Sequence, residues 1–143
     1  MKIKQISIFL ENRKGRLHDA LKAIAKAKIN IRALSIADTQ EFGILRLIVN
    51  EPDQAKKVLE KNYFIVRENE VIAVGVPDTP GGLAGVLEVL QKADLNVEYI
   101  YAFVEKSGEK AVVVLRTENV DAGIKTLQAA GVEVLKSKEV YKL

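Results

Sequence analysis

Apolar residues along this chain follow two periods. Leu and Ile recur at i, i+4 and i+7 in residues 16–28 and again in 80–93, which predicts two amphipathic helices. Helical spacing also covers 52–61 and 119–130. Short runs rich in β-branched residues predict strands between the helices. The expected strands are 3–10, 31–38, 43–50, 64–67, 71–76, 97–105, 110–117 and 132–136. The segments "TQEF" (39–42) and "KSGE" (106–109) are predicted to be hairpin turns.

The second half of this pattern repeats the first. "NRKGRLHDALKAIAKAKINI" from Asn12 aligns with "DTPGGLAGVLEVLQKADLNV" from Asp78, an offset of 66 residues. Each half reads β-α-β-β-α-β, the order of the ferredoxin-like split βαβ arrangement. We therefore predict an α+β fold with two ferredoxin-like units, 1–69 and 70–143, each an antiparallel sheet with its helices on one face. The aligned turns "AKIN" and "ADLN" predict left-handed backbone at Asn30 and Asn96.

Composition narrows the class of protein. Apolar residues make up 48% and charged residues 29%, the balance of a soluble globular chain, and no apolar run reaches the length of a membrane span. The N-terminus shows no signal-peptide pattern, and Cys is absent, so we expect a cytoplasmic protein without disulfides. The net charge of +3 is spread along the chain and does not form a nucleic-acid-binding stripe.

The strand predicted at 97–105 is apolar on both sides. One alternating set is expected to point away from the helices, and the matching positions of the first half carry small residues. The two sets are Val97, Tyr99, Tyr101 and Phe103 in the second half, and Ala33, Ser35 and Ala37 in the first. Large and small side chains could interlock between the two units or leave a pocket; we favour packing. We also expect a homodimer that covers the remaining apolar surface.

The segment "PDTPGGLAGVL" (77–87) combines helix-start and ligand-site features. Pro80 suits the first helical position, and Thr79 or Asp78 could cap the helix. Gly81 and Gly82 lower helix propensity by about 1 kcal/mol each, and they would let a backbone or a ligand come close. A helix N-terminus attracts a carboxylate, and an adjacent Asp accepts from an ammonium group. The segment therefore fits either a capped helix start or a site for a zwitterionic amino acid.

The first copy of this loop, "ENRKGRL", differs in charge. Asn12 stands where the second copy has Asp78, and Gly15 stands where it has Gly81. Arg13, Lys14 and Arg16 make the first loop cationic. We expect the first loop to favour a carboxylate and the second an ammonium group.

These motifs resemble a known family. "DTPGGLAGVLEVL" followed by "LNV" is similar to the Asp-x-Pro-Gly-x-Leu signature of ACT domains, and the chain as a whole resembles two tandem ACT domains. The resemblance implies a regulatory protein that binds an amino acid through the loop between the first strand and first helix. By position it implicates Asn12, Gly15 and Leu17, and Asp78, Gly81 and Leu83. Our candidate ligand-binding set adds the other loop residues, Arg13, Lys14, Arg16, Thr79, Pro80 and Gly82. The first copy departs from the signature at Asn12 and Lys14, where Asp and Pro are usual.

Other functions find little support in the sequence. His18 is the only histidine, so neither a catalytic relay nor a usual transition-metal site is expected, and no cofactor motif is present. RNA-binding domains with the same element order need aromatic residues on their central strands, and "GILRLIVN" and "AVVVLRTE" carry none.

We therefore expect a non-catalytic sensor that holds an amino acid at the interface of two ACT domains and regulates a partner enzyme. The alternative is a constitutive dimerisation or enzyme-docking module without a ligand. Neither nucleic acid nor membrane is an expected partner.

Overall fold

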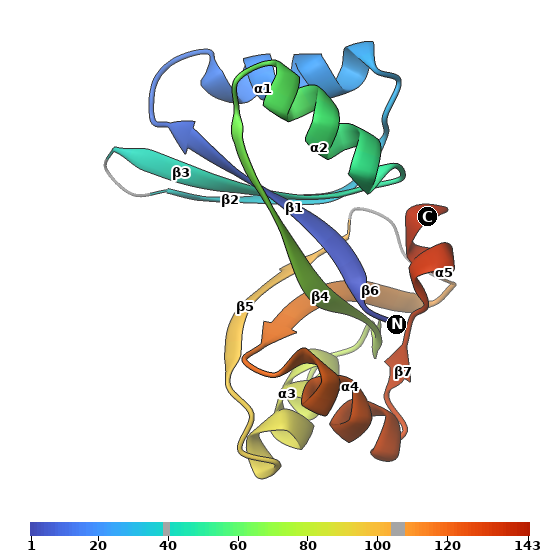
Figure 1. The fold of residues 1–143 in the computed structure, drawn as a ribbon. Helices are drawn as coiled ribbons and strands as arrows, with labels where there is room; N and C mark the ends of the chain where they lie inside the picture. Colours follow the sequence, from blue (N-terminus) through green and yellow to red (C-terminus); the bar gives the residue numbers. More distant parts are fainter. Residues whose placement is uncertain (39–40, 104–107) are drawn as a thin grey trace. The chain divides into compact units, whose positions relative to one another are not determined.

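The structure, a computed structural model, describes residues 1–38, 41–103 and 108–143. The predicted turns at 39–42 and 106–109 lie partly outside these residues. The elements follow the predicted order, so the twofold β-α-β-β-α-β arrangement is confirmed (Figure 1). They are β1 (Ile3–Glu11), α1 (Arg16–Lys26), β2 (Ile31–Asp38), β3 (Phe42–Val49), α2 (Pro52–Lys61), β4 (Ile65–Pro77), α3 (Gly82–Lys92), β5 (Val97–Ala102), β6 (Lys110–Thr117), α4 (Val120–Ala129), β7 (Glu133–Val134) and α5 (Ser137–Tyr141).

The first unit comprises Lys4–Asn69. Its strands lie in the order β2-β3-β1-β4, and the β2–β3 and β3–β1 pairs are antiparallel. Helices α1 and α2 cover one face of this sheet (Figure 1). Alternate residues of β1 point toward the helices and are buried there with Leu45 and Leu47 of β3. These β1 residues are Ile6, Ile8 and Leu10.

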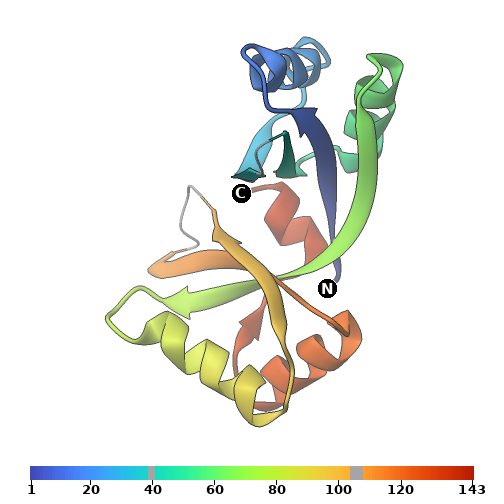
Figure 2. The same ribbon diagram turned by 90° about the vertical axis from the view of Figure 1, so that its left-hand side faces the viewer.

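The second unit comprises Glu70–Leu143 together with Met1–Ile3. Its strands lie in the order β7-β4-β6-β5, with α3 and α4 on one face (Figure 2). The first residues of the chain are tied to this unit by side-chain contacts: the Lys2 ammonium lies 3.1 Å from Asp121 and 3.7 Å from Glu70. The strand β1 therefore starts against one unit and continues into the other.

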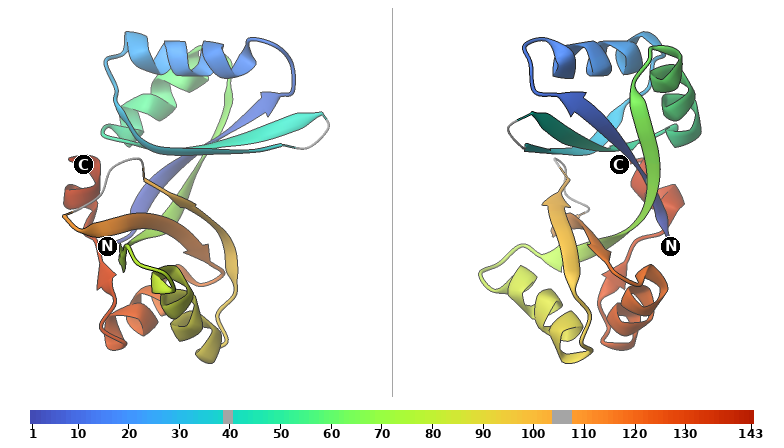
Figure 3. Two further views of the ribbon diagram at one scale, coloured as in Figure 1. Left: turned by 180° about the vertical axis from the view of Figure 1, so that it is seen from behind. Right: turned by 60° about the vertical axis from the view of Figure 1, so that its left-hand side comes forward.

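Strand β4 differs from the prediction. Two strands, 64–67 and 71–76, were expected, but Ile65–Pro77 forms one strand of 13 residues (Figure 3). Residues 68–70, which lie between the two predicted strands, also have extended backbone. At the other end of the chain, the strand predicted at 132–136 shortens to β7, and the Leu135 N–H donates to Ala73 O at 2.9 Å. Helix α5, which was not predicted, follows and buries Val140.

All four long helices end in the same way, and the prediction of left-handed Asn30 and Asn96 is wrong. The left-handed residues are Lys28, Tyr63, Asp94 and Gly131, each just after a helix C-cap. In α1 the Ile29 N–H donates to Ile24 O at 3.3 Å and the Lys28 N–H to Ala25 O at 3.0 Å. This Schellman pattern satisfies the last helical carbonyls, and it places the positive φ two residues before the predicted Asn.

A bulge in β5 corrects the predicted alternation. The register with β6 shifts between Val97 and Tyr99, so that Tyr99 pairs with Arg116 and Tyr101 with Val114. Val97 packs against the core under the helices and is not in the same set as Tyr99 and Tyr101. An extra residue in one strand moves the following side chains to the other face, which a strict alternation cannot anticipate.

Candidate functional site

The two predicted loops share one backbone design. In the second loop the Thr79 N–H donates to Pro77 O at 2.9 Å and the Gly82 N–H to Thr79 O at 3.0 Å. The first loop has the same bonds 66 residues earlier, from Arg13 to Glu11 O at 2.8 Å and from Arg16 to Arg13 O at 3.3 Å. The sequence repeat is thus a repeat of loop geometry as well.

Glycine caps both helices. Gly15 and Gly81 occupy the N-cap positions of α1 and α3 with φ of 90° and 83°, and neither helix has a side-chain cap. The predictions that Asp78 or Thr79 caps the helix and that Pro80 takes its first position are therefore wrong. Helix α3 begins at Gly82 because the chain turns through the left-handed residue Gly81 first.

Gly82, the other glycine of the second loop, is required for a different reason. A Cβ on Gly82 would overlap the carbonyl oxygen of Pro77, so the start of α3 lies directly against the end of β4. The backbone of the chain accounts for these glycines without a ligand. Gly15 and Gly81 adopt a positive φ, and Gly82 allows the start of α3 to approach the backbone of Pro77.

A hollow of about 580 Å³ lies beside the second loop. Pro77, Asp78 and Thr79 form one wall, and Gly108, Glu109 and Lys110 form the other. The two walls meet because Pro77 at the end of β4 pairs with Lys110 at the start of β6. The sequence analysis named Asp78 and Thr79 but missed residues 108–110; the strand order of a ferredoxin-like sheet could have indicated them.

Lys110 is held in place by Glu133. Its Nζ lies 2.8 Å from Glu133 Oε2, and the pair lies close to Gly75, where a Cβ would come within 2.7 Å of the same oxygen. A lysine ammonium has three donors, so one bond to Glu133 leaves capacity for a further acceptor. Asp78 and Lys110 thus both line the hollow, and the Lys110 ammonium is paired with Glu133.

Two of the cationic side chains of the first loop lie beside acidic neighbours. Arg13 lies 3.4 Å from Glu11, and Arg16 lies 3.8 Å from Asp19. The Arg16 guanidinium also stacks over the Phe64 ring, 4.5 Å from its centroid. Arg16 therefore packs onto its own unit.

The other predicted residues occupy more peripheral positions. The Asn12 N–H donates to Glu41 O at 2.8 Å, which ties the first loop to the residue before β3. Lys14 is exposed in the turn before Gly15. Leu17 and Leu83 lie in the first turns of their helices and are partly exposed.

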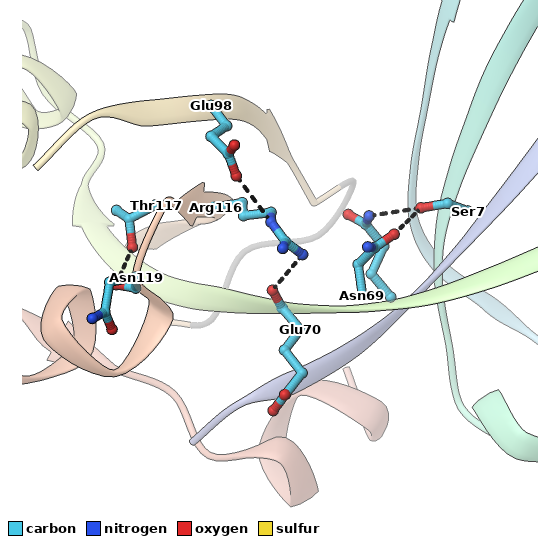
Figure 4. Close-up of polar contacts among 8 residues, drawn as sticks. Ser7, Asn69, Glu70, Glu98, Arg116, Thr117 and Asn119 are labelled. Atoms are coloured by element: carbon cyan, nitrogen blue, oxygen red, sulfur yellow. Dashed lines mark hydrogen bonds and ion pairs between the residues drawn. The ribbon is translucent and has the colours of Figure 1, made fainter.

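Two sets of polar contacts away from the helices were not predicted (Figure 4). In the second unit, Arg116 of β6 donates through Nε to Glu98 Oε1 at 3.0 Å and through a terminal nitrogen to Glu70 O at 3.4 Å. Arg116 thereby bridges both neighbouring strands. In the first unit, Ser7 donates to Asn69 Oδ1 at 2.6 Å and accepts from Gln5 Nε2 at 3.1 Å.

The described residues show no cluster of three or more His, Cys, Asp or Glu that could hold a metal ion. His18 is exposed on α1, 3.7 Å from Asp19. None of the described helices is long and apolar enough to cross a membrane.

A twice-repeated ferredoxin-like fold, with a glycine-capped loop between the first strand and first helix of each unit, defines a class of paired small α+β domains. The family model described as "ACT domain pair" matches residues 1–143, and the chain belongs to this family. No curated protein sequence matches the chain significantly.

Solved structures agree with this assignment. Protein BT0572 from Bacteroides thetaiotaomicron is 43% identical with a TM-score of 0.94, over 100% of this chain and 98% of that one. The ligand-free regulatory subunit of aspartate kinase from Thermus thermophilus has a TM-score of 0.62 at 18% identity, covering 89% of this chain and 91% of its own. The aspartate kinase of Clostridium acetobutylicum has a TM-score of 0.55 at 17% identity, over 90% of this chain and 33% of its own. At these identities the two kinase proteins show a shared fold.

Proposed function

We propose that this ACT domain pair is a non-catalytic sensor that binds an amino acid at the loop between β4 and α3. The observation that carries the proposal is the hollow in which Asp78 faces the Lys110 end of β6. Its volume falls within the range of small-molecule sites, roughly 300–1,000 Å³.

The charges of this hollow suit a zwitterion. The Asp78 carboxylate accepts from the α-ammonium group of the ligand. The ligand carboxylate binds at Lys110, supported by the positive end of the α3 dipole. Two loop N–H groups, those of Thr79 and Gly82, already donate within the loop, so Lys110 replaces them as the carboxylate partner.

The first loop has a different role in this proposal. Asn12, Arg13, Lys14, Gly15, Arg16 and Leu17 repeat the backbone of the site. However, Asn12 carries no charge, and Arg13 and Arg16 lie beside acidic neighbours. We infer that the first loop binds more weakly than the second.

Membership of the ACT domain pair family supports the proposal that this protein regulates an enzyme. A protein with this fold is described as the regulatory subunit of aspartate kinase, which supports a regulatory role for this ACT domain pair. The amino acid would change the affinity of this protein for its partner enzyme, by the same factor in both directions, as linkage requires.

Calorimetric titration of the full chain with each proteinogenic amino acid, at millimolar ligand, tests the sensor function. We expect heat of binding and a raised Tm with at least one of them. The absence of both signals for every amino acid would rule the function out.

The alternative function, a docking module without a ligand, is favoured by one observation: all three loop glycines are explained by the chain's own backbone. For that function the same titrations give no heat, while a partner enzyme binds equally well with and without amino acids.

A further inference from the structure

Two acidic residues line the hollow beside the second loop, one on each wall. Asp78 follows the last residue of β4, and Glu109 precedes the first residue of β6. Pro77 and Lys110 are the last pair of the antiparallel β4–β6 ladder, so Asp78 and Glu109 are the next residues beyond it on neighbouring strands. Like charges at opposite positions of neighbouring strands are destabilising. The end of this ladder therefore brings together two negative charges that a cation would stabilise.

The basic residue of the hollow does not balance these charges. Lys110 is the only basic residue among those described as lining it, and its Nζ is already bound to Glu133 Oε2 at 2.8 Å. With Glu133 included, three carboxylates stand against one ammonium group. Glu109 is exposed and has no hydrogen-bond or ion-pair partner among the described residues. A zwitterion has no net charge, so it leaves this excess of negative charge unchanged.

The first unit lacks this pair of charges. Asn12 follows β1 as Asp78 follows β4, and Glu41 precedes β3 as Glu109 precedes β6. The Asn12 N–H donates to Glu41 O at 2.8 Å, so the two equivalent positions lie side by side there. An uncharged amide thus stands in the first unit where the second has a carboxylate. The excess of negative charge is a property of the second loop.

We propose that the amino acid bound at this hollow carries a cationic side chain and that Glu109 selects it. This inference rests on the proposed function. Asp78 accepts from the α-ammonium group, Lys110 binds the ligand carboxylate, and Glu109 accepts from the second cationic group of the ligand. A charge-assisted hydrogen bond to a carboxylate without another partner favours such a side chain over a neutral one. The ligand class is therefore the amino acids that end in an ammonium or guanidinium group.

Calorimetric titration of the full chain tests the ligand class with lysine, arginine, norleucine and glutamate. Norleucine has nearly the shape of lysine but lacks its side-chain ammonium group. We expect lysine or arginine to bind about fivefold tighter than norleucine, the upper end for an exposed ion pair, and glutamate to bind most weakly. Preference for any neutral or acidic amino acid would overturn this inference and leave the sensor function in place. Binding by no amino acid would remove both.

A charge-removing variant tests the role of Glu109. In Glu109→Gln the affinity for lysine should fall about fivefold, to that for norleucine, because an exposed ion pair is lost. The affinity for norleucine should not change. Glu118→Gln is the matched control, since it removes the same charge directly after the other end of β6 and should leave both affinities unchanged. Unchanged lysine affinity in Glu109→Gln, or an equal loss for lysine and norleucine, would contradict selection by Glu109.

Thermal unfolding gives a second readout. Without ligand, Glu109→Gln should raise the Tm because it relieves the repulsion from Asp78, and Glu118→Gln should not. Lysine should raise the Tm of the unmodified protein more than that of Glu109→Gln. A lowered Tm for ligand-free Glu109→Gln would contradict the closeness of the two carboxylates. If calcium chloride raises the Tm of the unmodified protein but not of Glu109→Gln, and lysine raises neither, the carboxylates bind a metal ion and the proposal fails.

Discussion

Gly82, the first residue of α3, lies against the carbonyl oxygen of Pro77 with no space for a side chain between them. Its counterpart in the first unit is Arg16, whose side chain instead stacks over Phe64. The second loop is therefore closed more tightly onto the end of its strand. Because Pro77 and Asp78 form one wall of the hollow, this contact fixes the position of the proposed site.

Gly82→Ala should destabilise the protein by about 1–3 kcal/mol, the usual cost of forcing extra volume into a packed position. Urea unfolding followed by circular dichroism measures the change. Gly85→Ala is the matched control in the same helix, since no atom lies within 4 Å of its added Cβ. It should stabilise by about 0.5–1 kcal/mol through helix propensity. Destabilisation of equal size in both variants would refute the role of the Pro77 contact.

Tyr63→Gly should raise stability by up to about 1 kcal/mol. Tyr63 has a φ of 67° after the C-cap of α2, and glycine adopts this backbone without the strain of a Cβ. The side chain is 93% exposed, so its removal costs little packing. The change is measured as a shift in Tm, and Lys61→Gly, inside the last turn, should lower Tm. A lowered Tm for Tyr63→Gly would contradict the C-cap account.

The Arg16–Phe64 contact should appear in a double-mutant cycle. Arg16→Met and Phe64→Leu keep most apolar volume but remove the cation–π interaction, whose usual strength is about 0.5–2 kcal/mol. The Arg16 Nε is buried, and it has no hydrogen-bond partner within the described part of the chain, so we expect a coupling of about 1 kcal/mol, near the middle of that range. Additive losses of unfolding free energy in the double variant would show that the two side chains do not interact.

Lys4 should control the titration of Asp53. The hydrogen bond from Lys4 Nζ, at 2.9 Å, and the attraction of its charge lower the pKa of Asp53 below its ordinary value of 3.8. A lowered folded-state pKa contributes stability above the unfolded value, and this stability is lost as the pH falls through the folded value. In Lys4→Met the pKa of Asp53, followed by carboxyl NMR shifts, should rise toward 3.8. An unchanged pKa would remove Lys4 as the cause.

The order of elements was predictable because each helix and strand buries one face, so that its apolar residues recur in the sequence with the period of that element. Residues 31–38, 52–61 and 110–117 were predicted with the same bounds as the structure. The N-cap was not predictable in this way, because Asp78 and Thr79 are good capping residues and only the left-handed Gly81 excludes them from that position.

The sequence predicted one wall of the proposed site and missed the other. Asp78 belongs to a local motif, which the repeat at Asn12 made recognisable. Lys110 and Glu133 join it only through the strand order β7-β4-β6, and Glu133 contacts Lys110 because Gly75 leaves room between them. Such a contact depends on tertiary register, for which one sequence carries no direct signal.

Titration of Asp78→Asn tests the central claim most directly. This variant gives the second loop the residue found at Asn12 in the first and removes one carboxylate without changing its size. Asp94→Asn is the control, because it removes the same charge at the far end of α3, where Asn also tolerates the φ of 58°. With the amino acid that binds the unmodified protein, calorimetry should show affinity lowered at least tenfold, about 1.4 kcal/mol, for Asp78→Asn and unchanged for Asp94→Asn. Equal affinity of Asp78→Asn and the unmodified protein would contradict the account.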